Sequence, residues 1–292
     1  MNTPLAPLFG LSNGVACATT RPVIEQLADY LLRSRNLVAF TGAGISTESG
    51  IPDFRSPGGV WSRTRPVEWD DFVRSRSARV RYWKQRMAMY RGFATAQPND
   101  GHRALARLEA LGKLTAVVTQ NIDGLHQLAG SRRVIEIHGT ARIVACIACG
   151  KEWPPEVIHL RVAEGDEAPE CDACGAPLKS KTISFGQAMP ERAMREAAEL
   201  MAESDCCLVV GSSLVVEPAA SLPRVAKHHG ATLIILNHSD TPLDFSADLV
   251  VRAAIGETMR AVLDRIDAGW ADLRGREDSA GSPGAARCGT DG

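Results

Sequence analysis

The sequence lacks the features that mark several classes of protein. No apolar run approaches the roughly 20 residues that a membrane-spanning helix needs, so no membrane partner is expected. The N-terminus has neither a basic start nor a long apolar stretch, which makes it a poor signal peptide and favours a cytoplasmic location. With a formal net charge of -1, the chain also lacks a global field that would attract nucleic acid.

Cysteine is present in an informative pattern. Four of the eight cysteines form two C-x-x-C pairs separated by 21 residues, and they are Cys146, Cys149, Cys171 and Cys174. Each pair directs two thiolates at one centre, and two pairs complete the tetrahedron that zinc prefers. Because four thiolates leave no position for water, the pattern predicts a structural zinc ion rather than a catalytic one. Two reducible disulfides are the alternative, which the absence of a secretion signal disfavours.

Short apolar runs alternate with amphipathic segments along most of the chain. Continuous β-branched runs, which suit strands covered on both faces, occur at 37–40, 114–119, 207–211, 232–237 and 248–251. Segments with helical spacing of apolar residues lie between them, for example GHRALARLEALG and PERAMREAAELMAE. The alternation predicts an α/β fold with a Rossmann-like, mainly parallel sheet and helices on both faces.

Two segments interrupt this alternation and are expected to form a second small domain. Residues 141–180 hold both cysteine pairs with several prolines and glycines, so they are predicted to be a zinc-binding module of the zinc-ribbon kind. Residues from about 60 to 100 have the pattern of a helical excursion. The Rossmann-like domain is assigned to two segments, residues 21–140 and 181–268. Residues 1–20 and 269–292 are assigned as flexible tails.

A glycine-rich turn follows the first predicted strand, as a dinucleotide-binding loop would. It reads Gly42-Ala43-Gly44, but Thr47 occupies the place of the third glycine in G-x-G-x-x-G. About twenty residues on, the stretch GGVWSRT offers no carboxylate for a ribose. An ordinary dehydrogenase is therefore disfavoured. Instead GIPDFR, residues 50–55, places an acidic, an aromatic and a basic side chain directly after the loop.

The stretch GAGIS…GIPDFR resembles the sirtuin family of NAD-dependent protein deacylases. Further motifs match that family in the same order, and they are TQNID at 119–123, HG at 138–139 at the end of the expected strand VIEIHG, GSSL at 211–214, LN at 236–237 and the four cysteines. The resemblance covers about residues 22–268. It implies a transferase that consumes NAD: nicotinamide is released, and the acyl group passes from a protein lysine to ADP-ribose.

The resemblance also implies roles for single residues. His138 would be the general base that activates the ribose hydroxyls, which suits a side chain that titrates near neutrality. Asp123 would hold the nicotinamide carboxamide, Asn121 would orient the ribose and an attacking water, and Phe54 would cover the reacting carbon. The implied NAD-binding set is Gly42, Ala43, Gly44, Ser46, Asp53, Phe54, Arg55, Gln120, Asn121, Ile122, Asp123, Gly211, Ser212, Ser213 and Asn237. Taken singly, these residue types also suit a buried core histidine, polar turns and helix N-caps.

The acyl-lysine peptide is expected to lie as a strand between residues 184–190 and 214–218, held mainly by main-chain hydrogen bonds. The residues expected to contact it are Phe185, Gly186 and Val216. Family members that prefer acidic acyl groups carry a Tyr-x-x-Arg pair, which would bind a carboxylate. Here Tyr82 is followed by Gln85, so an uncharged acyl group is predicted.

Three other functions compete with a deacylase of acyl-lysine proteins. A mono-ADP-ribosyltransferase would use the same cleavage of NAD without an acyl-lysine, and a long-chain deacylase would use the same site. A zinc- and nucleotide-binding module without activity would need partner contacts, but residues 141–180 have no dense basic patch and no aromatic series for nucleic acid. The oligomeric state is left open by the sequence.

Overall fold

The computed structural model describes residues 21–54, 59–60 and 64–280. In this part of the chain the helices are α1 (Arg21–Arg33), α3 (Trp69–Arg74), α4 (Arg76–Thr95), α5 (Asp100–Ala110), α6 (Leu125–Leu128), α7 (Pro155–Ala163), α8 (Glu191–Glu203), α9 (Leu222–His228) and α10 (Ile255–Ala280), with short 3-10 helices η1 (Ala43–Ser49), η2 (Ala219–Ser221) and η3 (Asp244–Ser246). The strands are β1 (Leu37–Thr41), β2 (Leu114–Thr119), β3 (Val134–Glu136), β4 (Gly139–Cys146), β5 (Glu152–Trp153), β6 (Leu178–Thr182), β7 (Cys206–Val210), β8 (Thr232–Leu236) and β9 (Leu249–Val251). None of the described helices combines the length and apolar character that crossing a bilayer requires.

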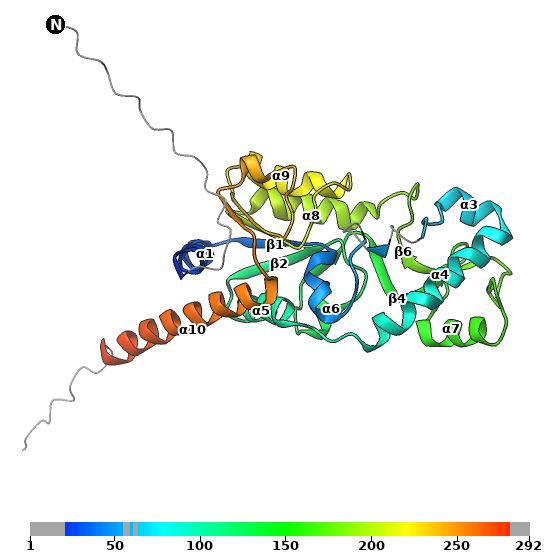
Figure 1. Ribbon diagram of the computed structural model, residues 1–292, viewed down its shortest axis with the longest axis horizontal. Coiled ribbons are helices and arrows are strands. Elements are labelled where there is room, and N and C mark those ends of the chain that lie inside the picture. The colour runs from blue at the N-terminus through cyan, green and yellow to red at the C-terminus, as the bar shows by residue number, and fades with distance from the viewer. Residues whose placement is uncertain (1–20, 55–58, 61–63, 281–292) are drawn as a thin grey trace, which may run out of the picture.

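The larger sheet is parallel throughout and has the order β3-β2-β1-β7-β8-β9. Strand β1 shows why continuous apolar runs suit it: Leu37 and Ala39 join the core on one face, while Val38 and Phe40 join the core on the other. Helices α1, α5 and α10 cover the first face, and α8 and α9 cover the second (Figure 1). The predicted α/β fold class is confirmed.

The smaller sheet is antiparallel, with the order β5-β4-β6, and it lies beside α3, α4 and α7 (Figure 1). Its core joins Val144 and Leu178 of the sheet to Phe72, Tyr82 and Trp83 of the helices. The ring of Tyr82 meets its neighbours edge to face, with centroids 4.9 Å from Phe72 and 5.5 Å from Trp83. The cysteine module and the helical excursion therefore share one core and form the second small domain that the fold class included.

The structure differs from the expected elements at two places. The strand expected over VIEIHG ends at Glu136, so His138 lies in a turn between β3 and β4 rather than on a strand. Helix α10 continues to Ala280, past residue 268, where the ordered chain was expected to end. The rest of the expected tails, 1–20 and 281–292, lies outside the described residues.

The order of the large sheet reverses direction between β1 and β7, and open α/β sheets have their ligand-binding crevice at the carboxyl ends of such strands. From β1 the chain continues to β2 and β3 on one side, whereas β7 leads to β8 and β9 on the other. The loops that follow β1 and β7 therefore leave in opposite directions, and open α/β sheets bind ligands at such a point. Most of the residues singled out in the sequence follow β1, β2, β7 or β8.

Candidate active site

Two glycine loops pack against each other at this crevice. The amides of Gly42 and Gly44 donate hydrogen bonds to the carbonyls of Val210 (3.1 Å) and Gly211 (2.8 Å). A Cβ added to Gly44 would lie 2.8 Å from the Gly211 oxygen, and one added to Gly211, whose φ is 64°, would lie 2.3 Å from the amide nitrogen of Ile45. Glycine is thus needed here because two backbones touch. These bonds occupy the amides of Gly42 and Gly44, two members of the NAD-binding set that the resemblance implies.

A buried polar cluster joins the turn after β1 to the loop after β2. The Ser46 hydroxyl donates to Asp123 Oδ2 at 2.7 Å and accepts from Asn121 Nδ2 at 3.1 Å. Asn121 Nδ2 also contacts the Gly42 carbonyl at 3.1 Å, and the Leu125 amide donates to Asp123 Oδ1 at 2.9 Å. Burial raises the pKa of Asp123, while the hydrogen bonds from Leu125 and Ser46 act in the opposite direction. Three of the predicted residues therefore form one connected network.

His138 is half-buried, and its Nδ1 lies 3.0 Å from the Gln120 carbonyl oxygen. A carbonyl only accepts hydrogen bonds, so Nδ1 must carry the proton of the neutral ring. The lone pair then resides on Nε2, which is the nitrogen that can accept a proton. The Gln120 side chain accepts a hydrogen bond from Ser212 Oγ at 2.7 Å. Gln120 therefore connects the histidine to the loop after β7.

Two buried histidines, which the sequence did not single out, lie beneath this cluster. His102 Nε2 is 3.5 Å from Ser46 Oγ, and His126 Nε2 is 2.9 Å from Thr41 Oγ1. Burial lowers the pKa of His102 to about 4 and that of His126 to about 3, so both rings are neutral near pH 7. In the sequence, each histidine lies in a segment with helical spacing of apolar residues. That spacing is the one sequence feature that could have predicted their burial.

The other predicted NAD-binding residues lie at the same edge of the sheet or close to it. Asn237 follows β8; its Nδ2 donates to the Ser239 carbonyl at 2.7 Å, and its own carbonyl accepts from Arg252 at 3.2 Å. Several more are partly buried in the loops after β1, β2 and β7, and they are Ala43, Asp53, Phe54, Ile122 and Ser213. Arg55 lies outside the described residues.

The predicted peptide-binding segments follow β6 and β7. Phe185 is 43% exposed, and its carbonyl accepts a hydrogen bond from the Trp69 amide at 2.9 Å, which ties this segment to α3 of the small domain. Gly186 adopts a φ of 79°, and Val216 is half-buried before η2. The segment 184–190 therefore follows a strand of the small sheet, and the segment 214–218 follows a strand of the large sheet.

The four cysteines of the C-x-x-C pairs meet in one cluster. Cys146 Sγ lies 3.5 Å from Cys174 Sγ, and Cys149 Sγ lies 3.6 Å from Cys171 Sγ. All four sulfurs lie within 4.8 Å of one another, and none of these cysteines forms a disulfide. Tetrahedral zinc with bonds of about 2.3 Å separates its sulfur ligands by roughly 3.8 Å. The cluster therefore fits a structural zinc ion.

This combination of a parallel sheet, a polar crevice at its switch point and a four-cysteine module defines a nucleotide-binding α/β protein with a structural metal module. A family model described as "Sir2 family" matches residues 42–218. Similar curated proteins are an NAD-dependent protein deacetylase of Rhodopseudomonas palustris, 50% identical over 81% of this chain and 94% of that protein, and NAD-dependent protein deacetylase 1 of Bradyrhizobium diazoefficiens, 49% identical over 82% and 94%. A solved structure described as "Sir2-p53 peptide-NAD+" superposes with a TM-score of 0.77 at 38% identity, covering 83% of this chain and 98% of that one. The chain belongs to the Sir2, or sirtuin, family.

Proposed function

We infer that this protein is an NAD-dependent protein-lysine deacylase, and specifically a deacetylase, of the transferase class. The observation that carries this inference is the hydrogen bond from His138 Nδ1 to the Gln120 carbonyl, because it leaves Nε2 as the basic nitrogen of the ring. Gln120 directly precedes Asn121, which belongs to the Ser46–Asn121–Asp123 network. The similar proteins of Rhodopseudomonas and Bradyrhizobium carry the name of this activity. Acyl-lysine proteins are then the substrates.

The donor set in the crevice fits NAD. Hydroxyls, amides and one carboxylate gather there, which suits ribose and carboxamide groups. When bound, NAD supplies the electrophilic ribose carbon and the ADP-ribose that accepts the acyl group. Asp123 and Ser46 would hold the carboxamide, Gln120 and Asn121 the nearer ribose, and Asn237 the adenosine ribose. His138 Nε2 would take the proton of a ribose hydroxyl, and Phe54 would keep water from the reacting carbon.

The domains divide this work. The Rossmann-like part, residues 21–140 and 181–268, would bind NAD, and residues 141–180 would hold one zinc ion through the four cysteines, away from the chemistry. Phe185, Gly186 and Val216 would contact the acyl-lysine peptide. Free thiols that serve as metal ligands are typical of a reducing compartment, which supports a cytoplasmic location.

The acyl group that best suits this site is uncharged. Tyr82 is 6% exposed because its ring is part of the small-domain core, and Gln85 Nε2 donates to the Arg65 carbonyl at 2.8 Å. Neither side chain is therefore placed to bind a carboxylate, and acetyl or longer apolar acyl groups are expected to react faster than succinyl.

The test is nicotinamide release from NAD, measured with no peptide, with an acetyl-lysine peptide and with a succinyl-lysine peptide. Release that requires the acetyl peptide and falls by roughly a thousandfold or more in His138→Ala is expected, since that variant loses the base. The control variant is His229→Ala, which removes an exposed histidine after α9. Release without peptide would favour ADP-ribosyl transfer, and no release with acetyl or longer acyl peptides would leave a binding module.

A further inference from the structure

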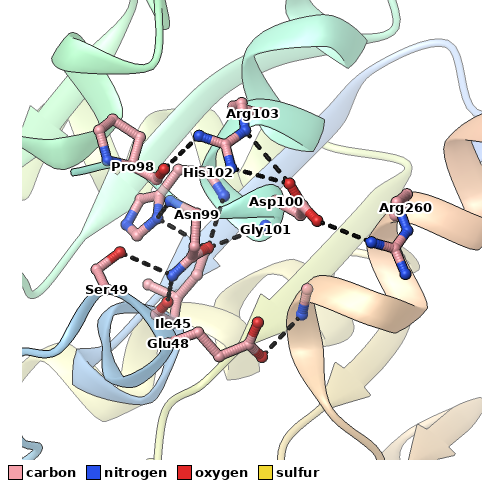
Figure 2. Close-up of polar contacts among 11 residues, drawn as sticks. Ile45, Glu48, Ser49, Pro98, Asn99, Asp100, Gly101, His102, Arg103 and Arg260 are labelled. Carbon is pink, nitrogen blue, oxygen red and sulfur yellow. Dashed lines mark hydrogen bonds and ion pairs between the residues drawn. The ribbon is translucent and has the colours of Figure 1, made fainter.

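The turn that carries Ser46 is held in place from behind by Asn99. This residue is the N-cap of α5, where its Oδ1 accepts from the amides of Gly101 (3.0 Å) and His102 (3.4 Å). Its Nδ2 performs a second task, because it donates to the Ile45 carbonyl at 2.7 Å and contacts Ser49 Oγ at 3.0 Å (Figure 2). One side chain therefore caps a helix and holds both sides of Ser46.

Glu48 ties the same turn to the C-terminal helix. Its Oε1 accepts a hydrogen bond from the Gly256 amide at 2.9 Å, at the start of α10. Amides in the first turn of a helix have no partner within the helix, so the carboxylate satisfies one of them and meets the positive end of the helix dipole. A Cβ on Gly256 would lie 2.1 Å from Glu48 Oε2, so glycine is what allows the carboxylate to approach.

Helices α5 and α10 form one platform beneath the turn. Arg260 Nη1 of α10 donates to Asp100 Oδ2 of α5 at 3.3 Å (Figure 2), and Arg107 pairs with Asp267 at 2.9 Å further along. The helices also touch directly, since a Cβ on Gly101 would lie 2.9 Å from Ile255 Cγ2. Asn99 and Glu48 thus anchor the turn to two elements that are themselves joined.

We propose that Asn99 and Glu48 are positioning residues for the NAD site, which hold the Ala43–Ser49 turn so that the Ser46 hydroxyl stays on the Asp123 carboxylate; this rests on the proposed function. The turn needs such anchors because it is a short 3-10 helix, whose own hydrogen bonds have poor geometry. Asn99 fixes the carbonyl of the residue directly before Ser46, so a shift there moves the hydroxyl that bonds Asp123.

Two variants separate this role from simple stability. Asn99→Asp keeps an oxygen that caps α5, as Asp and Asn cap equally well, but loses the donor to Ile45. Glu48→Ala removes the bond to Gly256, and Glu48→Gln restores an acceptor of the same length. The matched control is Glu257→Ala, which removes an exposed carboxylate from the same first turn of α10. Steady-state kinetics, NAD affinity by calorimetry and urea unfolding are measured for each.

Asn99→Asp and Glu48→Ala are expected to raise KM and Kd for NAD, by roughly tenfold for Asn99→Asp, which loses a buried hydrogen bond, and by less for Glu48→Ala, whose bond is partly buried. The KM for the acetyl peptide is expected to change less than about twofold. Glu48→Gln and Glu257→Ala should stay near the native values. Native NAD affinity in both variants would overturn the proposal. A second result would also overturn it: kcat falls in proportion to the loss of stability while the affinity for NAD is unchanged. That is the result that a purely structural role predicts. The calorimetric Kd tests the proposal even if the native chain releases no nicotinamide, which would contradict the proposed function alone.

Discussion

Single residues without side chains decide how closely the two loops at the crevice approach each other. Gly44 and Gly211 are in backbone contact, and the amide of Gly44 donates to the carbonyl of Gly211. In a dinucleotide fingerprint, the first glycine is usually explained by the tight turn and the second by the close approach of the ligand. Here the protein itself already requires them, because the loop after β7 occupies the space that a Cβ would take.

Gly211→Ala is therefore expected to damage both stability and NAD binding. The left-handed conformation alone costs about 1–2 kcal/mol for alanine, and the contact with Ile45 adds to it, so the free energy of unfolding should fall by roughly 3 kcal/mol. Gly112→Ala is the matched control, since Gly112 has a φ of 71° but open space around it. Urea unfolding and the Kd for NAD would check this, and equal losses in the two variants would show that the contact contributes nothing.

At the scale of elements, the zinc module and helices α3 and α4 depend on each other. Cys146 and Cys171 are buried in the same hydrophobic cluster as Tyr82 and Trp83. The zinc site and the hydrophobic core therefore stabilise the small domain together, because Cys146 and Cys171 belong to both. Without both, the module would have little to hold it together, because its strand β5 has only two residues and its one helix, α7, has nine.

Cys171→Ala is expected to lower the zinc content from one ion per chain to none and to loosen the small domain. The buried ring of Trp83 should then become exposed, which tryptophan fluorescence would report as a red shift, and the peptide-dependent activity should be lost. Cys207→Ala is the control: this thiol is buried in β7, and burial raises its pKa, so it is neutral and takes no part in the cluster. An unchanged fluorescence spectrum in zinc-free Cys171→Ala would contradict the idea that the metal holds this domain together.

At the scale of the whole molecule, buried neutral histidines connect elements that lie far apart in the chain. His102 on α5 and His126 on α6 lie near one another, with ring centroids 4.9 Å apart and ring planes inclined by 59°. His102 reaches the turn after β1, and His126 reaches strand β1 itself. A charge on either ring would be desolvated and close to its neighbour. The folded state therefore resists protonation of both.

The free energy of unfolding is expected to fall as the pH drops below about 6.5, the ordinary pKa of histidine. Between that value and the folded pKa values of about 4 and about 3, the unfolded chain binds the protons and the folded chain does not. Each histidine then contributes a slope of up to about 1.4 kcal/mol per pH unit. The raised pKa of Asp123 acts in the opposite direction, so it reduces the slope at the acid end.

Urea unfolding between pH 5.5 and 7.5 in zinc-containing buffer would measure this slope. His126→Gln should flatten it, because the variant has no ring to protonate in the unfolded chain, whereas His229→Gln, at an exposed position, should leave it as it is. A native slope in His126→Gln would mean that the acid sensitivity comes from elsewhere, for example from the zinc thiolates.

The sequence by itself determined the fold class, the family and the four thiolates, because each of these depends on spacing within short segments. A buried parallel strand is a continuous apolar run, and a C-x-x-C turn directs two sulfurs wherever it stands. Only the tertiary structure decided that Tyr82 is a core residue, that the amides of Gly42 and Gly44 are occupied, and that Asn99 and Glu48 hold the turn around Ser46. The physical reason is clearest for the turn around Ser46, whose hydrogen bonds with Asn99 and Gly256 join residues from 50 to 208 positions apart. They depend on how helices pack on the sheet, which no local pattern contains.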